Sequence, residues 1–165
     1  MKSIETLQFT VDKENRTVHV SKEFSAPKDL VWSAWTEKEL LDQWWAPKPW
    51  KSVTRQMEFK VGGIRTYAMV GPNGEEHWAL AKYTSISPKT NFKFLDAFCD
   101  SQGNVSREMP RSNWNVNFVD NNESTEVKIE IRHKKLEDLE KLIEMGFKEG
   151  FTMALGHLEE VLEKR

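Results

Sequence analysis

Two charged residues that alternate with apolar ones are the best candidates for chemistry in this chain of 165 residues. Arg55 shares its alternation with three apolar side chains: Val53, Met57 and Phe59. Asp96 does the same with three phenylalanines: Phe92, Phe94 and Phe98. If both segments are strands, each charge lies on the face of its apolar neighbours. Because a buried charge is costly without a partner, Arg55 and Asp96 would pair or bind a polar group. The alternatives are a bulge that turns one of them outward and a purely structural ion pair.

Aromatic residues and helix glycines extend this candidate site. The adjacent Trp44 and Trp45 either clamp an aromatic ligand or seal one end of the core. Gly146, Gly150 and His157 share the apolar face of the C-terminal segment, so the glycines either allow close helix–sheet packing or open a hollow. His157 is then either a cavity residue or a satisfied core histidine. The predicted cavity lining comprises ten residues: Trp44, Arg55, Met57, Phe94, Asp96, Trp114, Phe147, Gly150, Phe151 and His157.

Other kinds of site lack their usual spacing. The four histidines are far apart in sequence and form no H-x-x-E-H pattern, so we predict no metal site and no cofactor. Gly62-Gly63 is not followed by the Lys-Ser/Thr of a phosphate-binding loop, and no serine occupies a G-x-S-x-G elbow. Catalysis would rest on Asp96 or His157, and a non-enzymatic role is the stronger prediction.

Composition restricts the compartment and the partners. The formal net charge is −2, which gives no electrostatic basis for binding nucleic acid or an anionic membrane. The single cysteine, Cys99, suits a reducing compartment, and neither a signal peptide nor an apolar run of ~20 residues is present. We therefore expect one cytoplasmic domain over residues 1–165, in which residues 1–15 are a loose arm or an edge strand.

Hydrophobic periodicity predicts the elements that position these residues. A strand over 16–24 precedes two short helices, over 29–35 and about 40–44, the second starting at a capping box from Thr36 to Glu39. Six strands follow, over 51–59, 64–70, 77–86, 91–98, 113–119 and 125–133. One long helix covers 135–163. Because the strands are joined by short turns, we expect an α+β fold: a bent, mostly antiparallel sheet wrapped on the C-terminal helix, with a cavity between them.

Four stretches together resemble a known family. They are Phe24–Pro27 leading into Val31-Trp32, Leu40–Pro47, the Gly62-Gly63 pair with Ile86–Pro88, and Gly146-Phe147 with Leu155, Leu158 and Leu162. The pattern resembles the START-like (SRPBCC) superfamily and, within it, single-domain bacterial members of the family named for an activator of the heat shock protein 90 ATPase. The family usually has tryptophan where Phe147 stands and arginine where Lys22 stands.

The resemblance implies a helix-grip fold and, for function, two alternatives to simple ligand binding. One is a co-chaperone of a heat shock protein 90 type ATPase, with a role in the stress response. The other is an enzyme of the polyketide cyclase or dehydrase type. The residues themselves favour a cavity that binds a small hydrophobic or aromatic molecule, and a chaperone is the further possible partner.

Overall fold

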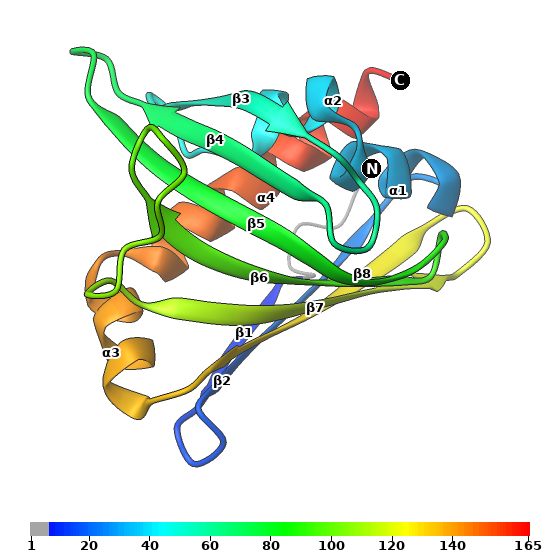
Figure 1. Ribbon diagram of the computed structural model, residues 1–165. Coiled ribbons are helices and arrows are strands. Elements are labelled where there is room, and N and C mark those ends of the chain that lie inside the picture. Colours follow the sequence, from blue (N-terminus) through cyan, green and yellow to red (C-terminus); the bar gives the residue numbers. More distant parts are fainter. Residues whose placement is uncertain (1–6) are drawn as a thin grey trace.

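The computed structural model describes residues 7–165 and shows an eight-stranded antiparallel sheet bent around a C-terminal helix (Figure 1). Its strand order is β1-β2-β8-β7-β6-β5-β4-β3. The strands are β1 (Gln8–Asp12), β2 (Thr17–Phe24), β3 (Lys51–Met57), β4 (Ile64–Val70), β5 (Glu76–Ser87), β6 (Asn91–Cys99), β7 (Arg111–Asp120) and β8 (Thr125–His133). Each of the strands from β3 to β7 pairs with the next along the chain, as the short turns predict.

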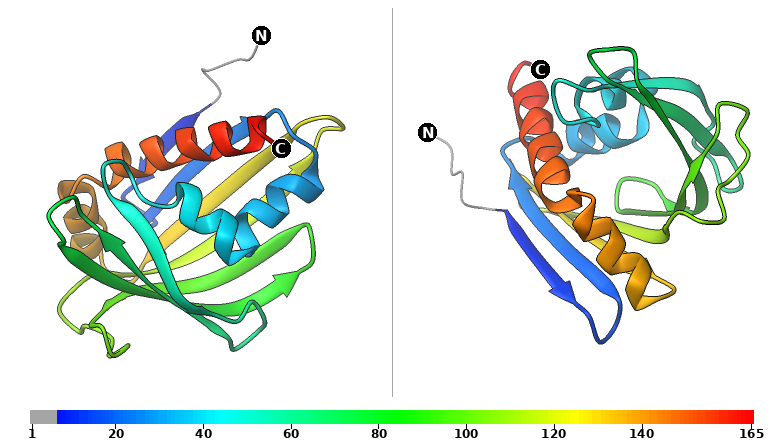
Figure 2. Two further views of the ribbon diagram at one scale, coloured as in Figure 1. Left: turned by 90° about the horizontal axis from the view of Figure 1, so that it is seen from above. Right: turned by 90° about the vertical axis from the view of Figure 1, so that its left-hand side faces the viewer.

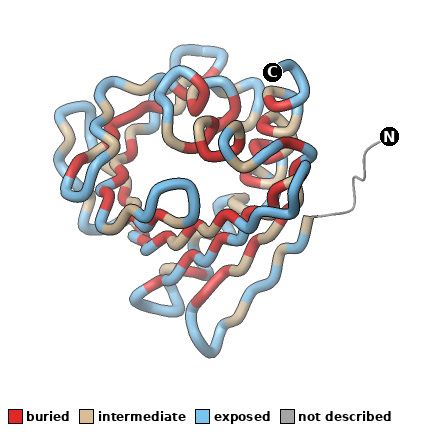
Figure 3. Tube along the Cα trace, turned by 90° about the vertical axis from the view of Figure 1, so that its right-hand side faces the viewer, coloured by how far each residue is buried: buried red, intermediate tan, exposed pale blue. Residues whose placement is uncertain are grey.

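Alternating burial along the strands gives the sheet an inner and an outer face (Figure 3). In β8, Val127, Ile129 and Ile131 are buried, and the charged residues between them are more exposed, as predicted. Gln8–Asp12 is an edge strand paired with β2, so the loose-arm alternative is wrong for this segment. Residues 1–6 of the predicted arm lie outside the described residues.

Two short helices, α1 (Lys28–Thr36) and α2 (Lys38–Trp44), follow β2 as predicted. The prediction of a capping box between them is wrong. Thr36 ends α1, where its hydroxyl donates to the Trp32 carbonyl oxygen at 2.9 Å, and Glu37 occupies the N-cap position of α2 without a side-chain cap. The helices carry three buried tryptophans against one end of the sheet: Trp32, Trp35 and Trp44.

The predicted continuous C-terminal helix is also wrong, because the chain forms two helices, α3 (Leu136–Glu144) and α4 (Phe147–Glu163). Gly146 separates them in the left-handed conformation with φ 92°, which glycine adopts without the penalty that a Cβ brings. The 17 residues of α4 span about 25 Å and lie across the inner face of the sheet (Figure 2). Buried Lys22 of β2 forms an ion pair with Glu159 of α4 at 3.4 Å, which ties the helix to the sheet. Within residues 7–165, no helix is long and apolar enough to cross a membrane.

Candidate functional site

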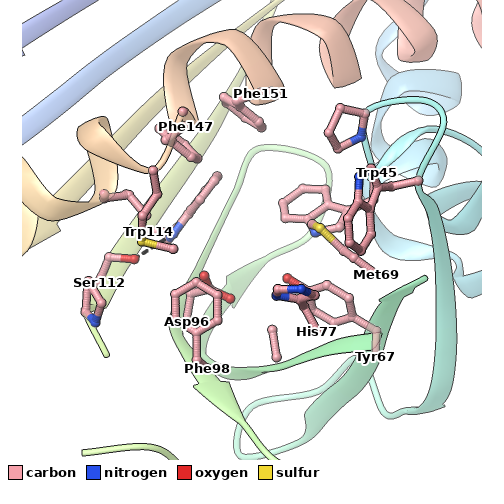
Figure 4. A pocket seen from close by; sticks show the side chains of 18 of the residues that line it. Trp45, Tyr67, Met69, His77, Asp96, Phe98, Ser112, Trp114, Phe147 and Phe151 are labelled. Carbon is pink, nitrogen blue, oxygen red and sulfur yellow. Dashed lines mark hydrogen bonds between the residues drawn. The ribbon is translucent and has the colours of Figure 1, made fainter. Parts of the chain in front are cut away.

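A cavity of about 340 Å³ lies between the inner face of the sheet and the start of α4 (Figure 4). Its walls come from β4 to β8, from the segment after α2, and from the α3–α4 junction. The residues whose side chains or backbone line it are Trp45, Pro47, Trp50, Tyr67, Met69, His77, Ala79, Asp96, Phe98, Pro110, Ser112, Trp114, His133, Leu142, Met145, Gly146, Phe147, Gly150 and Phe151. The cavity is therefore mostly apolar, with a few polar groups.

Aromatic rings form the wall on the side of α4. Phe147 and Phe151, one turn apart on the helix, stack with ring centroids 5.2 Å apart. Trp114 of β7 meets Phe151 edge-to-face at 5.4 Å, and Trp45 lies 5.8 Å from Trp114. These contacts hold four large rings, from α4, β7 and the segment after α2, around one space, which suits a flat apolar ligand.

Polar residues cross the floor of the cavity in one row. Strand register places Asp96 of β6 opposite Ser112 of β7, and Ser112 opposite His133 of β8. In the other direction Asp96 faces Ala81 of β5, which faces Arg65 of β4. Directly opposed residues point to the same face of a sheet, with Cα atoms about 4.5–5.5 Å apart. The row therefore brings a carboxylate, a hydroxyl and an imidazole into the cavity, with a guanidinium beyond Ala81.

Asp96 is the acid of this row. Its Oδ1 atom is buried, and no hydrogen-bond partner is found for it among the described residues. Burial raises the pKa of Asp96 to about 7, and the positive charge of Arg65 opposes that rise without cancelling it. Near neutral pH the group therefore exists as a mixture of carboxylic acid and carboxylate.

Arg65 is buried but is held by other partners. Its Nη2 donates to Ser52 Oγ at 2.9 Å, its Nε donates to Thr54 Oγ1 at 3.1 Å, and Nη2 lies 3.5 Å from Asp42 Oδ1. The guanidinium also lies 3.9 Å from the centre of the Tyr67 ring. The guanidinium of Arg65 is thus held by Asp42, Ser52 and Thr54, and among the described residues no cation lies in hydrogen-bond contact with Asp96.

His133 lies at the other end of the row and is 1% exposed. Neither ring nitrogen has a hydrogen-bond partner among the described residues. Burial lowers the pKa of His133 below its usual value, so the neutral imidazole is the favoured form. Between Asp96 and His133, Ser112 Oγ accepts the indole N–H of Trp114 at 3.0 Å, which leaves its own O–H available to donate (Figure 4).

The more exposed lining residues mark the opening of the cavity. His77 of β5 and Met145 at the α3–α4 junction are exposed, and Trp50 is half-buried. The Trp50 and His77 rings meet edge-to-face with centroids 5.2 Å apart. The solvent-exposed side of the cavity therefore lies at this pair and at Met145.

Five of the ten predicted lining residues surround this cavity: Asp96, Trp114, Phe147, Gly150 and Phe151. Gly150 shows why the helix glycine matters. A Cβ built on it would meet Pro47 Cγ at 3.6 Å, an ordinary contact, and no atom of the described strands lies within 4 Å, so the glycine does not pack against the sheet. Of the two glycines on the predicted helical face, Gly146 separates α3 from α4, and Gly150 leaves room in the cavity.

Arg55 does not line the cavity, because β3 contains a bulge. The register with β4 shifts between Thr54 and Gln56, so Ser52 and Thr54 point inward and Arg55 points outward. The Arg55 guanidinium is exposed, donates to the Ser101 carbonyl oxygen and lies 6.0 Å from the Trp78 ring. The bulge alternative raised by the sequence is therefore the correct one, and the buried guanidinium near Asp96 belongs to Arg65.

The other four predicted residues also lie outside the cavity. Met57 returns to the inner face after the bulge and packs against the core. Trp44 is 1% exposed and donates its indole N–H to the Ala34 carbonyl oxygen at 2.9 Å, so it fills the core while Trp45 lines the cavity. Phe94 lies beneath the lining, stacked on Trp114 at 5.2 Å. His157 accepts the backbone N–H of Lys48 at 3.4 Å on a separate surface, where burial lowers its pKa.

Two polar lining residues, Ser112 and His133, and the buried Arg65 beside the cavity are not among the predicted residues, although alternation could have found them. Arg65 alternates with Tyr67 and Met69 of the same strand, which line the cavity, although Arg65 itself lies just outside it. Ser112 precedes Trp114 by two positions, and His133 follows Ile131 by two. Extending the inward face to the ends of β7 and β8 places both at the cavity.

Solved structures with the same architecture identify the class. A bent antiparallel sheet closed over a C-terminal helix is the helix-grip fold of START-like (SRPBCC) domains, a fold that commonly binds hydrophobic ligands. A protein from Arthrobacter aurescens is similar with a TM-score of 0.92 and 28% identity, covering 97% of this chain and 93% of its own. Protein Ms6760 from Mycobacterium smegmatis is similar with a TM-score of 0.87 and 25% identity, covering 94% and 95%. A Staphylococcus epidermidis protein has a TM-score of 0.82 and 26% identity, with 94% of each chain covered.

The family follows from the sequence match. The model of the family described as Activator of Hsp90 ATPase homolog 1-like protein matches residues 25–163, and the chain belongs to that family. A search of curated proteins finds no match.

Proposed function

We propose that this protein binds a small apolar or aromatic molecule in the cavity beneath α4. The observation that carries the proposal is an open space of about 340 Å³ walled by Trp45, Trp114, Phe147 and Phe151. Ligand pockets are typically hollows of roughly 300–1,000 Å³ with mostly apolar walls and a few placed polar groups. The cavity under α4 has this size and composition, and the helix-grip fold commonly binds such ligands.

A neutral fluorescent probe tests this proposal. N-phenyl-1-naphthylamine brightens in apolar surroundings, and we expect saturable brightening with the wild-type protein. Gly150→Leu should weaken binding by about tenfold or more, because the leucine side chain enters the cavity.

Gly156→Leu on the same helix is the matched control. A Cβ at Gly156 meets nothing within 4 Å, and this residue does not line the cavity, so binding should be unchanged. Binding that does not saturate, or that is equal in wild type and Gly150→Leu, would contradict the proposed site.

The family match supports a second candidate, modulation of an Hsp90-type ATPase. The observation behind it is the match over residues 25–163 to the family described by that activity. We expect added protein to change the turnover of the organism's own chaperone at tens of micromolar. Gly150→Leu should retain the effect if the chaperone contacts the outer surface. No change in turnover and no binding at these concentrations would remove this candidate.

A further inference from the structure

The charged residues that line the cavity are unbalanced in sign. Among the described residues that line it, Asp96 is an acid and none is lysine or arginine. The nearby guanidinium of Arg65 lies beyond Ala81 and is engaged by Asp42, Ser52 and Thr54. The part of the cavity lining that the structure describes therefore presents a carboxylate without a lysine or arginine beside it.

The unpaired Asp96 oxygen indicates which kind of ligand group would fit the cavity. A carboxylate with a buried oxygen that lacks a hydrogen bond is costly to ionise, and a cation from a ligand beside the carboxylate would offset that cost. Asp96 points from β6 toward the space below Phe147 and Phe151 (Figure 4). One further acceptor, Ser112 Oγ, lies next to it along the row, and the neutral His133 ring follows beyond Ser112.

The aromatic wall favours the same chemistry. Faces of tryptophan and phenylalanine attract cations within about 6 Å of the ring centre, and the attraction is stronger away from water. Trp45, Trp114 and Phe151 surround the space above Asp96. An ammonium group would thus meet a carboxylate below and aromatic rings around it, and its apolar body would occupy the rest of the cavity.

Resting on the proposed ligand-binding function, we infer that the ligand is a protonated amine with an aromatic or apolar body, and that its ammonium group pairs with Asp96. Ser112 Oγ, next to Asp96 in the row, accepts a further N–H of the ammonium group. A ligand carboxylate would place a second negative charge beside Asp96, with Arg65 already engaged. An uncharged ligand would leave the Asp96 carboxylate without a counter-charge.

Binding of an amine is linked to the ionisation of Asp96. Burial raises the pKa of Asp96 to about 7, so below that pH an ammonium must displace the proton. Affinity should therefore rise between pH 6 and pH 8. The titratable and charged groups around Asp96 are Arg65 and Tyr67 on β4, His77 and Tyr83 on β5, Cys99 on β6 and His133 on β8. The lining residues of α4 are Phe147, Gly150 and Phe151, which carry no charge.

Three indole probes of similar shape test the inference by titration calorimetry. They are tryptamine, which is cationic, 3-ethylindole, which is neutral, and indole-3-propionate, which is anionic. At pH 8 we expect tryptamine to bind about tenfold or more tighter than 3-ethylindole, because an ion-paired hydrogen bond is stronger than a neutral one. Indole-3-propionate should bind weakest.

Asp96→Asn should abolish the preference for tryptamine and leave the affinity for 3-ethylindole within about twofold. Asp29→Asn is the matched control, since Asp29 is an exposed acid of α1 paired with Lys89. The wild-type protein supplies a test that needs no variant: tryptamine affinity should rise, and proton release should fall, between pH 6 and pH 8.

The outcomes separate the two proposals. Equal binding of tryptamine and 3-ethylindole, a preference that survives in Asp96→Asn, or tighter binding of indole-3-propionate would overturn the amine inference and leave cavity binding intact. If none of the three probes and no N-phenyl-1-naphthylamine binds, both proposals fail.

Discussion

The inner face of the sheet is built from the same strands at both ends but is filled at one end and hollow at the other. On β6, Phe92 and Asp96 are four residues apart on this face. Phe92 meets Trp32 and Trp35, the rings that α1 supplies, whereas Asp96 faces the cavity below α4. The covering helices therefore decide whether a strand position must be apolar. Where α4 begins after Gly146 and carries Gly150, no large side chain fills the space.

The largest expected effect is the loss of a ring at the filled end. Trp44→Ala should lower the free energy of unfolding by about 3–5 kcal/mol, because it removes a fully buried ring and leaves a cavity. Phe147→Ala at the hollow end should cost only about 1–2 kcal/mol, since Phe147 is half-buried and already borders open space. Urea unfolding of both variants measures the difference. Equal losses would mean that the two ends are equally well packed.

The next effect concerns the charge of Asp96 in the ligand-free protein. Its pKa rises from an ordinary 3.8 to about 7 on folding, so between these values the folded state binds more protons than the unfolded state. Stability from this group is thus complete below pH 3.8 and is lost as the pH rises through about 7. At roughly 1.4 kcal/mol for each unit of pKa, the loss is at most about 4 kcal/mol.

Asp96→Asn should remove this loss. We expect the variant to be more stable than wild type by about 2–4 kcal/mol at pH 8, with the gain shrinking toward pH 4. Urea unfolding from pH 4 to pH 8 measures it, and Asp29→Asn again serves as the exposed control. A gain that does not depend on pH would show that the Asp96 carboxylate is not the source. His133, with its lowered pKa, acts in the opposite sense below pH 6.5 and is present in both proteins.

Alternation of apolar residues was enough to predict most of the fold. The bounds of β4 and β8 match the predicted 64–70 and 125–133, and Asp96, Trp114 and Phe151 were placed at the cavity by the same reasoning. The prediction succeeds because an apolar repeat of two or 3.6 residues identifies the buried face of a strand or helix. It does so regardless of which element packs against that face.

The errors arose where a single residue changed the backbone. The bulge in β3 reversed the direction of Arg55, and nothing in its residue types marks the position of an extra residue. Gly146 was assigned to a helical face, yet its positive φ ends one helix and begins the next. Trp44 and Trp45 have the same chemistry, and only the end of α2 decides which of them faces the core.

The smallest expected effect is also the sharpest probe of the hollow end. Gly150→Leu and Gly156→Leu replace two glycines of α4, and each should gain about 0.5–1 kcal/mol from helix propensity. At Gly150 the new side chain also enters the cavity, where burying it should add about 1 kcal/mol. The Cβ of the new side chain would meet Pro47 Cγ at 3.6 Å, an ordinary contact that does not require the helix to move.

Thermal unfolding should therefore rank Gly150→Leu above Gly156→Leu, and both above wild type. For a domain of this size 1 kcal/mol corresponds to about 2–4 °C, so the two variants should be separable. A melting temperature for Gly150→Leu below that of wild type would mean that the glycine packs against its surroundings after all. The gain in stability should coincide with lost probe binding, because the leucine occupies the space that the ligand needs. Glycine at position 150 would then make the protein less stable than leucine would, and in return it keeps the cavity open for a ligand.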